Sequence, residues 1–288
     1  MDDVRSVVHG LVESMQQELV RDLLILPPND GQDWKPEILP RISIEKLFDN
    51  PAELTAGWSW LQDARTEWTV GGADWMYGAD VRGFDDVQWN DRGIEQYFRA
   101  VRRWKEQLIV LVHLSAGAPA RATELMSIQH KNGPEAKSQR GIFIENQMMA
   151  FVTTYYKGYS AGGRFKVIHR FVPEEVAELV AYYLWLVQPF VEYLQFVSKQ
   201  YIGEPSSFLW EPEPEEDWEA GEGEEIDEEL NDEDTHIDQG EEICSAVPAN
   251  VDGFWDTNRV RKVMQRETEK RIAVRIGVAL WRQAYPAI

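Results

Sequence analysis

The stretch spanning residues 91–199 constrains the fold of this chain most, because its periodicity changes in a fixed order. Residues 91–116 carry apolar side chains at helical spacing and predict a long amphipathic helix. Residues 141–155 and 165–172, rich in β-branched and aromatic side chains, predict a hairpin followed by a third strand. A strongly apolar helix is predicted over 174–199, where two glutamates follow a proline. This order predicts a mainly α protein with a small antiparallel β-sheet, an α+β fold.

The remaining pattern divides the chain into three predicted regions. Residues 1–43 hold an N-terminal helix and a Pro-rich connector, and residues 44–116 form a helical region. Residues 117–288 form the main domain, which contains an insert at 211–250. The shorter predicted elements are helices at 44–49, 53–63 and 121–130, a loop pinned by aromatic residues over 68–83, and a basic helix over 258–278.

Acidic side chains gather in residues 211–242, which hold 18 acidic residues and no Lys or Arg. The whole chain has 50 acidic and 29 basic residues and a formal net charge of -21. Without those 18 acids, 32 acidic residues remain against the same 29 basic ones, so the body of the protein is nearly neutral. The composition predicts that 211–250 is disordered. The global charge therefore does not exclude a nucleic-acid partner.

Several classes of protein are excluded by what the sequence lacks. The single cysteine, Cys244, excludes an internal disulfide and a cysteine-built zinc site. No apolar run approaches the ~20 residues of a membrane span, and the charged first thirty residues do not form a signal peptide. A phosphate-binding loop of the helicase type is missing as well. We expect a soluble intracellular protein with no metal, no cofactor and no membrane partner.

Four residues have the chemistry needed to act on a phosphodiester: Arg121, Glu124, Lys157 and Arg282. Two arginines suit this task, because each is always charged and offers a planar set of donors to phosphate oxygens. A lysine in a hairpin loop can protonate a leaving hydroxyl. Arg121 precedes Glu124 by about one helical turn, so the carboxylate is expected to hold the guanidinium in place.

Each of these residues also has an ordinary interpretation. Opposite charges three residues apart on a helix commonly form a surface ion pair, and a loop lysine needs no further role. His169, in the third strand, is then a partly buried strand histidine, and Arg282 forms a cation–π pair with Trp281. The order of the residues and their helix–hairpin–strand–helix setting favour the functional interpretation.

The runs that carry most information lie within residues 112–189: Gly-Ala-Pro-Ala-Arg-Ala-Thr-Glu-Leu, Gly-Ile-Phe-Ile-Glu-Asn, Tyr-Tyr-Lys-Gly-Tyr and His-Arg-Phe-Val-Pro-Glu-Glu-Val. This segment resembles a fungal domain found upstream of the helicase in telomere-linked RecQ-type helicase proteins and in related mobile-element proteins. That domain is similar to the tyrosine recombinase catalytic domain of Crypton-type elements. The resemblance covers roughly residues 45–288, and it implies a recombinase-like domain preceded by a helical region and a location in the nucleus.

Carried over by position, Arg121 matches the first arginine of the recombinase site and Glu124 the acidic residue of the same helix. Lys157 matches the hairpin lysine and Arg282 the second arginine. The residues expected to contact DNA are Arg121, Lys157, Lys166, His169, Arg259, Arg261, Lys262 and Arg282.

The chain departs from the family pattern around the second arginine. Ala279 stands where the family has a histidine, and Gln283 stands at a position that is often histidine. Tyr285 is too close to Arg282 to be the nucleophile, which the family spacing would put beyond Ile288. We therefore expect a vestigial site without its nucleophile, and no catalysis by this chain alone.

Three functions remain open on the sequence. The first is a DNA-binding, degenerate or truncated tyrosine-recombinase-like domain of a fungal helicase-associated or mobile-element protein. The second is a non-catalytic protein-interaction module whose acidic residues 211–242 bind basic partners such as histones, although such a run is also consistent with an inert linker. The third, an active recombinase or topoisomerase, requires a nucleophilic tyrosine.

Overall fold

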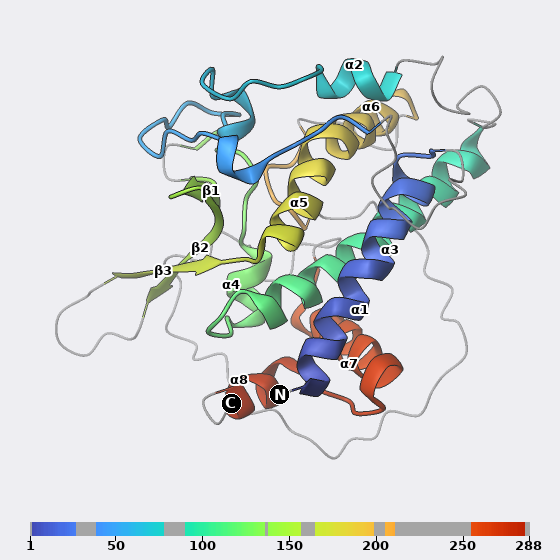
Figure 1. Ribbon diagram of the computed structural model, residues 1–288, viewed down its shortest axis with the longest axis vertical. Coiled ribbons are helices and arrows are strands. Elements are labelled where there is room, and N and C mark those ends of the chain that lie inside the picture. Colours follow the sequence, from blue (N-terminus) through green and yellow to red (C-terminus); the bar gives the residue numbers. More distant parts are fainter. Residues whose placement is uncertain are drawn as a thin grey trace.

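The computed structural model describes residues 2–26, 39–77, 90–135, 138–156, 165–198, 205–210 and 255–285. The predicted acidic insert at 211–250, the hairpin lysine Lys157 and most of the Pro-rich connector lie outside these residues. The described parts of the chain are mainly helical and contain one three-stranded antiparallel sheet (Figure 1). The predicted α+β class is confirmed.

Helix α1, Asp2–Glu18, continues into a π-helical turn, η1, at Leu19–Leu23. The side chains of Val7, Leu11 and Met15 are buried, and their four-residue spacing puts them on one face of the helix. This face packs against α3 and α7. The N-terminal helix predicted from apolar spacing is therefore present, and it is part of the core.

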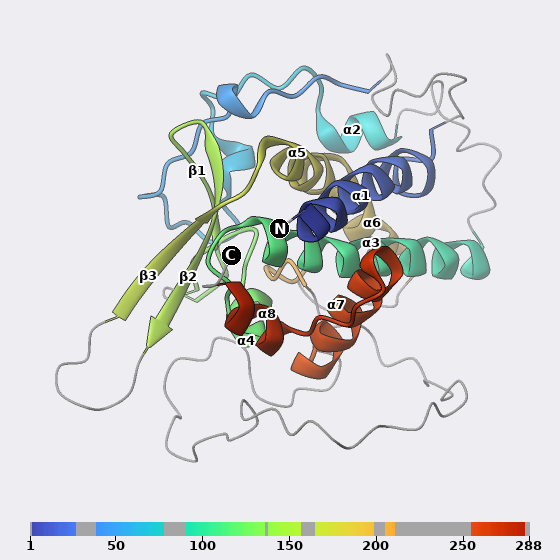
Figure 2. The ribbon, with the colours of Figure 1, turned by 60° about the horizontal axis from the view of Figure 1, so that its bottom comes forward.

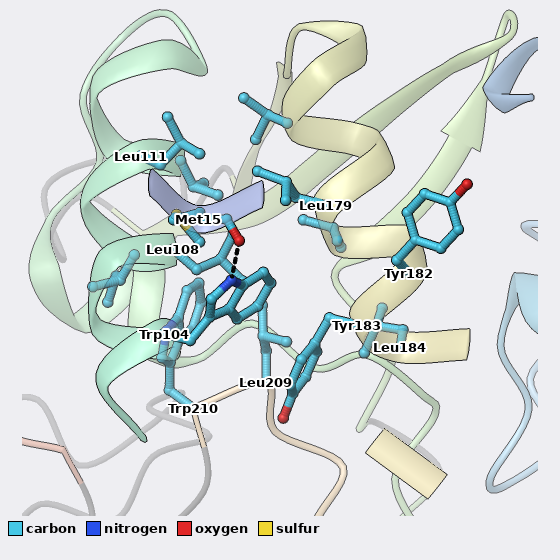
Figure 3. Packing of buried hydrophobic residues seen from close by; sticks show 14 of the residues in the cluster. Met15, Trp104, Leu108, Leu111, Leu179, Tyr182, Tyr183, Leu184, Leu209 and Trp210 are labelled. Atoms are coloured by element: carbon cyan, nitrogen blue, oxygen red, sulfur yellow. Dashed lines mark hydrogen bonds between the residues drawn. The ribbon is translucent and has the colours of Figure 1, made fainter. Parts of the chain in front are cut away.

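Helix α3, Asp91–Ser115, matches the long helix predicted over residues 91–116. The Asn90 side chain caps its start by accepting a hydrogen bond from the Gly93 amide at 2.9 Å. Near its middle, Trp104 Nε1 donates a hydrogen bond to the Met15 carbonyl oxygen at 3.0 Å (Figure 3). This bond joins α3 to α1 inside the core.

The apolar helix predicted over 174–199 consists of three segments, α5 at Glu174–Tyr182, η6 at Tyr183–Val187 and α6 at Gln188–Val197. Pro189 has no backbone N–H to donate to the Trp185 carbonyl four residues earlier, and the π-helical segment η6 immediately precedes α6. The helical run continues past the proline with this change in hydrogen-bond spacing. Figure 3 shows Tyr183 from this run beside Trp104, and their rings stack at 5.1 Å.

Helix α2, Gly72–Tyr77, packs against η6. A Cβ atom on residue 72 would lie only 2.0 Å from the Trp185 carbonyl oxygen, so this close approach requires glycine. The loop predicted over 68–83 therefore contains a helix, and its last six residues lie outside the described part of the chain.

The sheet has the order β1-β2-β3, with β1 at Ile142–Glu145, β2 at Met148–Tyr156 and β3 at Phe165–Phe171. Asn146 and Gln147 connect β1 to β2 with φ values of 50° and 64°. Two consecutive residues with positive φ are typical of the tight hairpin turn that matches the twist of the strands. All three strands were predicted from the sequence, and their positions are confirmed.

The short helices predicted at 44–49 and 53–63 are wrong. Only two 3-10 turns are present there, η2 at Ile44–Lys46 and η3 at Trp60–Gln62. Between them, polar side chains accept hydrogen bonds from nearby backbone amides, and Gly57 has a φ of 78°. These local bonds compete with helical ones, so the apolar spacing did not produce helices.

Helix α4, Ala122–Met126, is shorter than the helix predicted over 121–130. Gln129 leaves the helix to form a β-bridge with Phe208, a pairing between distant parts of the chain that local spacing does not reveal.

The basic helix predicted over 258–278 is α7, Thr257–Ile272, which ends at Ala273 with a φ of 54°. A separate short helix, α8 at Val278–Ala284, follows and packs against α7.

One hydrophobic cluster contains residues from each helix described above and from strands β1 and β2. It includes residues from each of the three predicted regions, for example Leu11, Trp60, Trp104, Leu184 and Met264. The sheet, α4 and α8 lie on one side of the molecule in both ribbon views (Figures 1 and 2). The elements that carry most of the predicted site residues are therefore attached to one packed core.

Candidate functional site

Arg121 lies immediately before α4 in an extended conformation and is exposed. The chain reaches it from α3 through a tight turn in which Gly117 has a φ of 79°. The Glu124 carboxylate accepts a hydrogen bond from the Arg121 backbone amide at 3.4 Å. An acidic residue in the first helical turn is favourable there, because the backbone amides at a helix start carry partial positive charge.

Glu124 also forms an ion pair with Arg170 of β3, with 3.3 Å between Oε2 and Nη2. The Arg170 side chain is almost fully buried, and it donates further hydrogen bonds to the Ala118 carbonyl at 2.9 Å and to the Thr153 hydroxyl. Burial lowers the pKa of Arg170, and Glu124 opposes this shift. Arg170 thus connects β2, β3, the α3–α4 loop and α4.

The partner of Glu124 differs from the one expected. The sequence pattern assigned the carboxylate to the guanidinium of Arg121, whereas it contacts the backbone of Arg121 and pairs with Arg170. Arg170 and the exposed His169 are neighbours in β3, and successive strand residues point to opposite faces of a sheet. That alternation is the one sequence signal that could have identified Arg170 as the inward-facing residue.

Arg282 of α8 is half-buried. Its positive charge acts on the buried histidine His113, as does the charge of Arg170. His113, in the last turn of α3, is 3% exposed. Its pKa is lowered to about 4, first by burial and then by the positive charges of Arg170 and Arg282. The two arginines therefore act on one buried imidazole, although they come from different elements.

Helix α8 also contacts the turn that leads to Arg121. A Cβ atom on Gly117 would lie 4.0 Å from the Tyr285 hydroxyl oxygen. The Trp281 and Tyr285 rings meet edge to face at 5.8 Å. In both ribbon views α8 lies near the end of α3 that leads into α4 (Figures 1 and 2). The turn before Arg121 and the end of α8, far apart in sequence, are thus brought together.

The two other β3 residues expected to contact DNA, Lys166 and His169, are both exposed. His169 Nδ1 lies 3.0 Å from the Glu145 carboxylate, so the histidine is an exposed residue with an acidic neighbour. The ordinary interpretation, a partly buried strand histidine, is wrong for this residue. Lys157 lies outside the described residues.

The three residues of α7 expected to contact DNA differ in their surroundings. Arg259 donates to Glu106 of α3 at 2.9 Å, and its guanidinium lies 4.1 Å from the centre of the Trp255 ring. Arg261 is half-buried, whereas Lys262 is exposed. Arg259 thus forms an ion pair between α7 and α3. Of the three residues, Lys262 is the most exposed to solvent.

A second buried charged residue, Arg140, was not identified from the sequence. It pairs with Asp49 at 2.9 Å, and both side chains are at most 1% exposed. Its guanidinium lies over the Trp58 ring, 4.5 Å from the ring centre, and over the Phe143 ring at 4.6 Å. Burial raises the pKa of Asp49, while Arg140 opposes the shift. Asp49 and Trp58 also line an open depression of about 620 Å³.

The described residues contain no group of three or more His, Cys, Asp or Glu side chains that could hold a metal ion. None of the helices within the described ranges is both long and apolar enough to cross a membrane. Comparison with protein-family models, with curated proteins and with solved structures found no match for this chain.

Proposed function

We propose that this protein binds DNA through a tyrosine-recombinase-like site in which Arg121 and Arg282 grip a backbone phosphate. The observation that supports the proposal is that the turn at Gly117, which leads to Arg121, lies against Tyr285 at the end of α8, the helix that carries Arg282. On the other side of Arg121, Glu124 pairs with the buried Arg170. Guanidinium groups suit this task because their donors match the geometry of phosphate oxygens. Lys157, and Lys166 on the exposed part of β3, would extend the contact along the backbone.

The proposed activity is binding, and no strand cleavage is included. Ala279 stands where the family that this chain resembles usually has a histidine, and Gln283 stands at a position that is often histidine, so the groups that would assist proton transfer there are missing. By resemblance, the protein would act in the nucleus as part of a fungal helicase-associated or mobile-element protein.

The proposal is tested by fluorescence anisotropy with a labelled DNA duplex and the full chain. Binding is expected to weaken steeply as salt increases, because each neutralised phosphate releases counterions. The double variant Arg121→Gln/Arg282→Gln should lose most of the affinity. Arg275→Gln is the matched control, because Arg275 is a 68% exposed arginine paired with Glu269. An absence of binding by the unaltered protein would refute the proposal.

The alternative is a protein-interaction module that acts through its acidic residues. It predicts binding to basic proteins and no binding to the DNA duplex. Residues 211–242 hold 18 acids without a basic residue, a charge pattern that suits basic protein partners. A chain lacking 211–242 would then lose its binding to histones, and neither form would bind the duplex. DNA binding by both forms would exclude this alternative.

A further inference from the structure

The turn that leads to Arg121 is contacted from two sides. On the side of the sheet, Arg170 of β3 donates a hydrogen bond to the Ala118 carbonyl oxygen at 2.9 Å. On the side of α8, the Tyr285 hydroxyl oxygen lies 4.0 Å from the position that a Cβ atom on Gly117 would occupy. Gly117 has a φ of 79°, which glycine adopts without strain. The path of the chain into Arg121 is therefore bounded by a strand on one side and by α8 on the other.

Helix α8 is fixed near both of its ends. Just before its start, the Ile276 amide donates a hydrogen bond at 3.0 Å to the hydroxyl of Thr268, a buried residue of α7. At its end, the half-buried Tyr285 ring meets the buried Trp281 ring edge to face, with 5.8 Å between the ring centres. The Tyr285 side chain thus packs on the core through Trp281 and meets the turn at Gly117 with its hydroxyl end.

Arg282 precedes Tyr285 by three residues, and the backbone of Tyr285 is still helical, with φ of -53° and ψ of -43°. Helical residues three apart are neighbours, with roughly 5–6 Å between their Cβ atoms. The contact of Tyr285 with the turn therefore limits how far Arg282 can lie from the segment that carries Arg121.

We propose that Tyr285 is a positioning residue, which holds α8 against the turn at Gly117 and so sets the spacing at which Arg121 and Arg282 meet one phosphate. The inference rests on the proposed phosphate contact of the two arginines. A site of this kind works only when its side chains stay within roughly 0.5 Å of the required geometry. Tyr285 acts here through the position of α8 and needs no contact with the phosphate itself.

The test measures the affinity of the full chain for a labelled DNA duplex by fluorescence anisotropy at constant salt. Tyr285→Ala should weaken binding roughly tenfold, because the arginines lose their fixed spacing. Tyr285→Leu keeps an apolar side chain beside Trp281 but is too short to replace the outer part of the ring, so it should do the same. Tyr285→Phe keeps the ring and should bind within about twofold of the unaltered protein. Leu280→Ala, at a 50% exposed position of the same helix, is the matched control and should leave the affinity unchanged.

A purely structural role would lower the stability without changing how the two arginines act together. Arg121→Gln and Arg282→Gln are therefore measured singly and together in the unaltered, Tyr285→Ala and Tyr285→Phe backgrounds. In the unaltered protein, the double variant should lose at least about twofold less affinity than the product of the two single losses. The losses should multiply in the Tyr285→Ala background, and the coupling should return with Tyr285→Phe. If Tyr285→Ala does not fold, as judged by circular dichroism, Tyr285→Leu takes its place.

The outcomes separate this inference from the proposed function. If the unaltered protein binds the duplex and the arginines remain coupled without the tyrosine ring, the inference is wrong and the proposed function stands. Losses that multiply already in the unaltered protein would overturn the inference together with the claim that both arginines hold one phosphate. If the unaltered protein does not bind the duplex, the proposed function and the inference both fail.

Discussion

The Glu124 carboxylate and the Arg170 guanidinium form an ion pair at 3.3 Å, although 46 residues separate them in the sequence. This pair fixes strand β3 against the start of helix α4, where the same carboxylate accepts a hydrogen bond from the Arg121 amide. The orientation of Arg121 therefore depends on a residue of the sheet. A phosphate site built on Arg121 would be held in place by this contact.

Removing either member of this pair should destabilise the protein. Arg170→Gln and Glu124→Gln each leave a largely buried partner without its counter-charge, and each should lower the free energy of unfolding by about 2–4 kcal/mol. The two losses should not add, because the double variant removes both charges; we expect a coupling energy of about 1–3 kcal/mol. Urea denaturation of the four proteins measures this cycle.

The control is the ion pair of Arg99 and Glu95 on α3, whose side chains are both exposed to solvent. Arg99→Gln should change the stability by less than about 1 kcal/mol. Additive losses in the Glu124–Arg170 cycle would show that the ion pair does not join β3 to α4 energetically.

Arg140 should be essential for folding stability. Arg140→Met leaves the Asp49 carboxylate buried without its ion pair and should cost about 3–5 kcal/mol in thermal or urea denaturation. Arg275→Met, which breaks the exposed pair with Glu269, should leave the stability nearly unchanged. Equal stability of both variants would contradict the view that the buried Asp49–Arg140 pair stabilises the fold.

Two buried histidines should make the protein sensitive to acid. The pKa of His113 is lowered to about 4 and that of His130 to about 3, in both cases mainly by burial. Below an unfolded pKa of about 6.5, the unfolded chain takes up protons that the folded chain excludes. Stability is therefore fully present above about pH 6.5 and falls as the pH decreases towards the folded values.

For His113, this loss should reach about 3 kcal/mol by pH 4. Urea denaturation between pH 7.5 and pH 4.5 should show a smaller pH dependence for His113→Gln than for the unaltered protein. His9→Gln, at an exposed position, should keep the original dependence. The same pH dependence in His113→Gln and the unaltered protein would contradict this explanation.

The sequence predicted the elements whose pattern is local. The helix over residues 91–116 and the three strands follow from apolar spacing and from strand-forming residues, and they are present at the predicted positions. Helix α4 was predicted too long, because Gln129 leaves it to pair with Phe208. A bond to a residue so distant along the chain has no local signature.

The candidate site was predictable only in part, for the same physical reason. Arg121, Glu124 and Arg282 were identified from their chemistry and order in the sequence. His113 and Arg170 were missed because their importance comes from burial and from neighbours on other elements. Arg259 was expected to contact DNA, but it forms an ion pair with Glu106 of α3 and packs over the Trp255 ring. Neither residue belongs to α7, so the spacing along that helix could not reveal these partners.

The central claim is that Arg121 and Arg282 act on the same phosphate, and a double-mutant cycle of DNA affinity tests it most directly. At constant salt, Arg121→Gln and Arg282→Gln should each weaken duplex binding by roughly tenfold. If both hold one phosphate, the double variant should lose clearly less than the product of the two losses, with a coupling of at least about 0.5 kcal/mol. Losses that multiply, or variants that bind like the unaltered protein, would contradict the account.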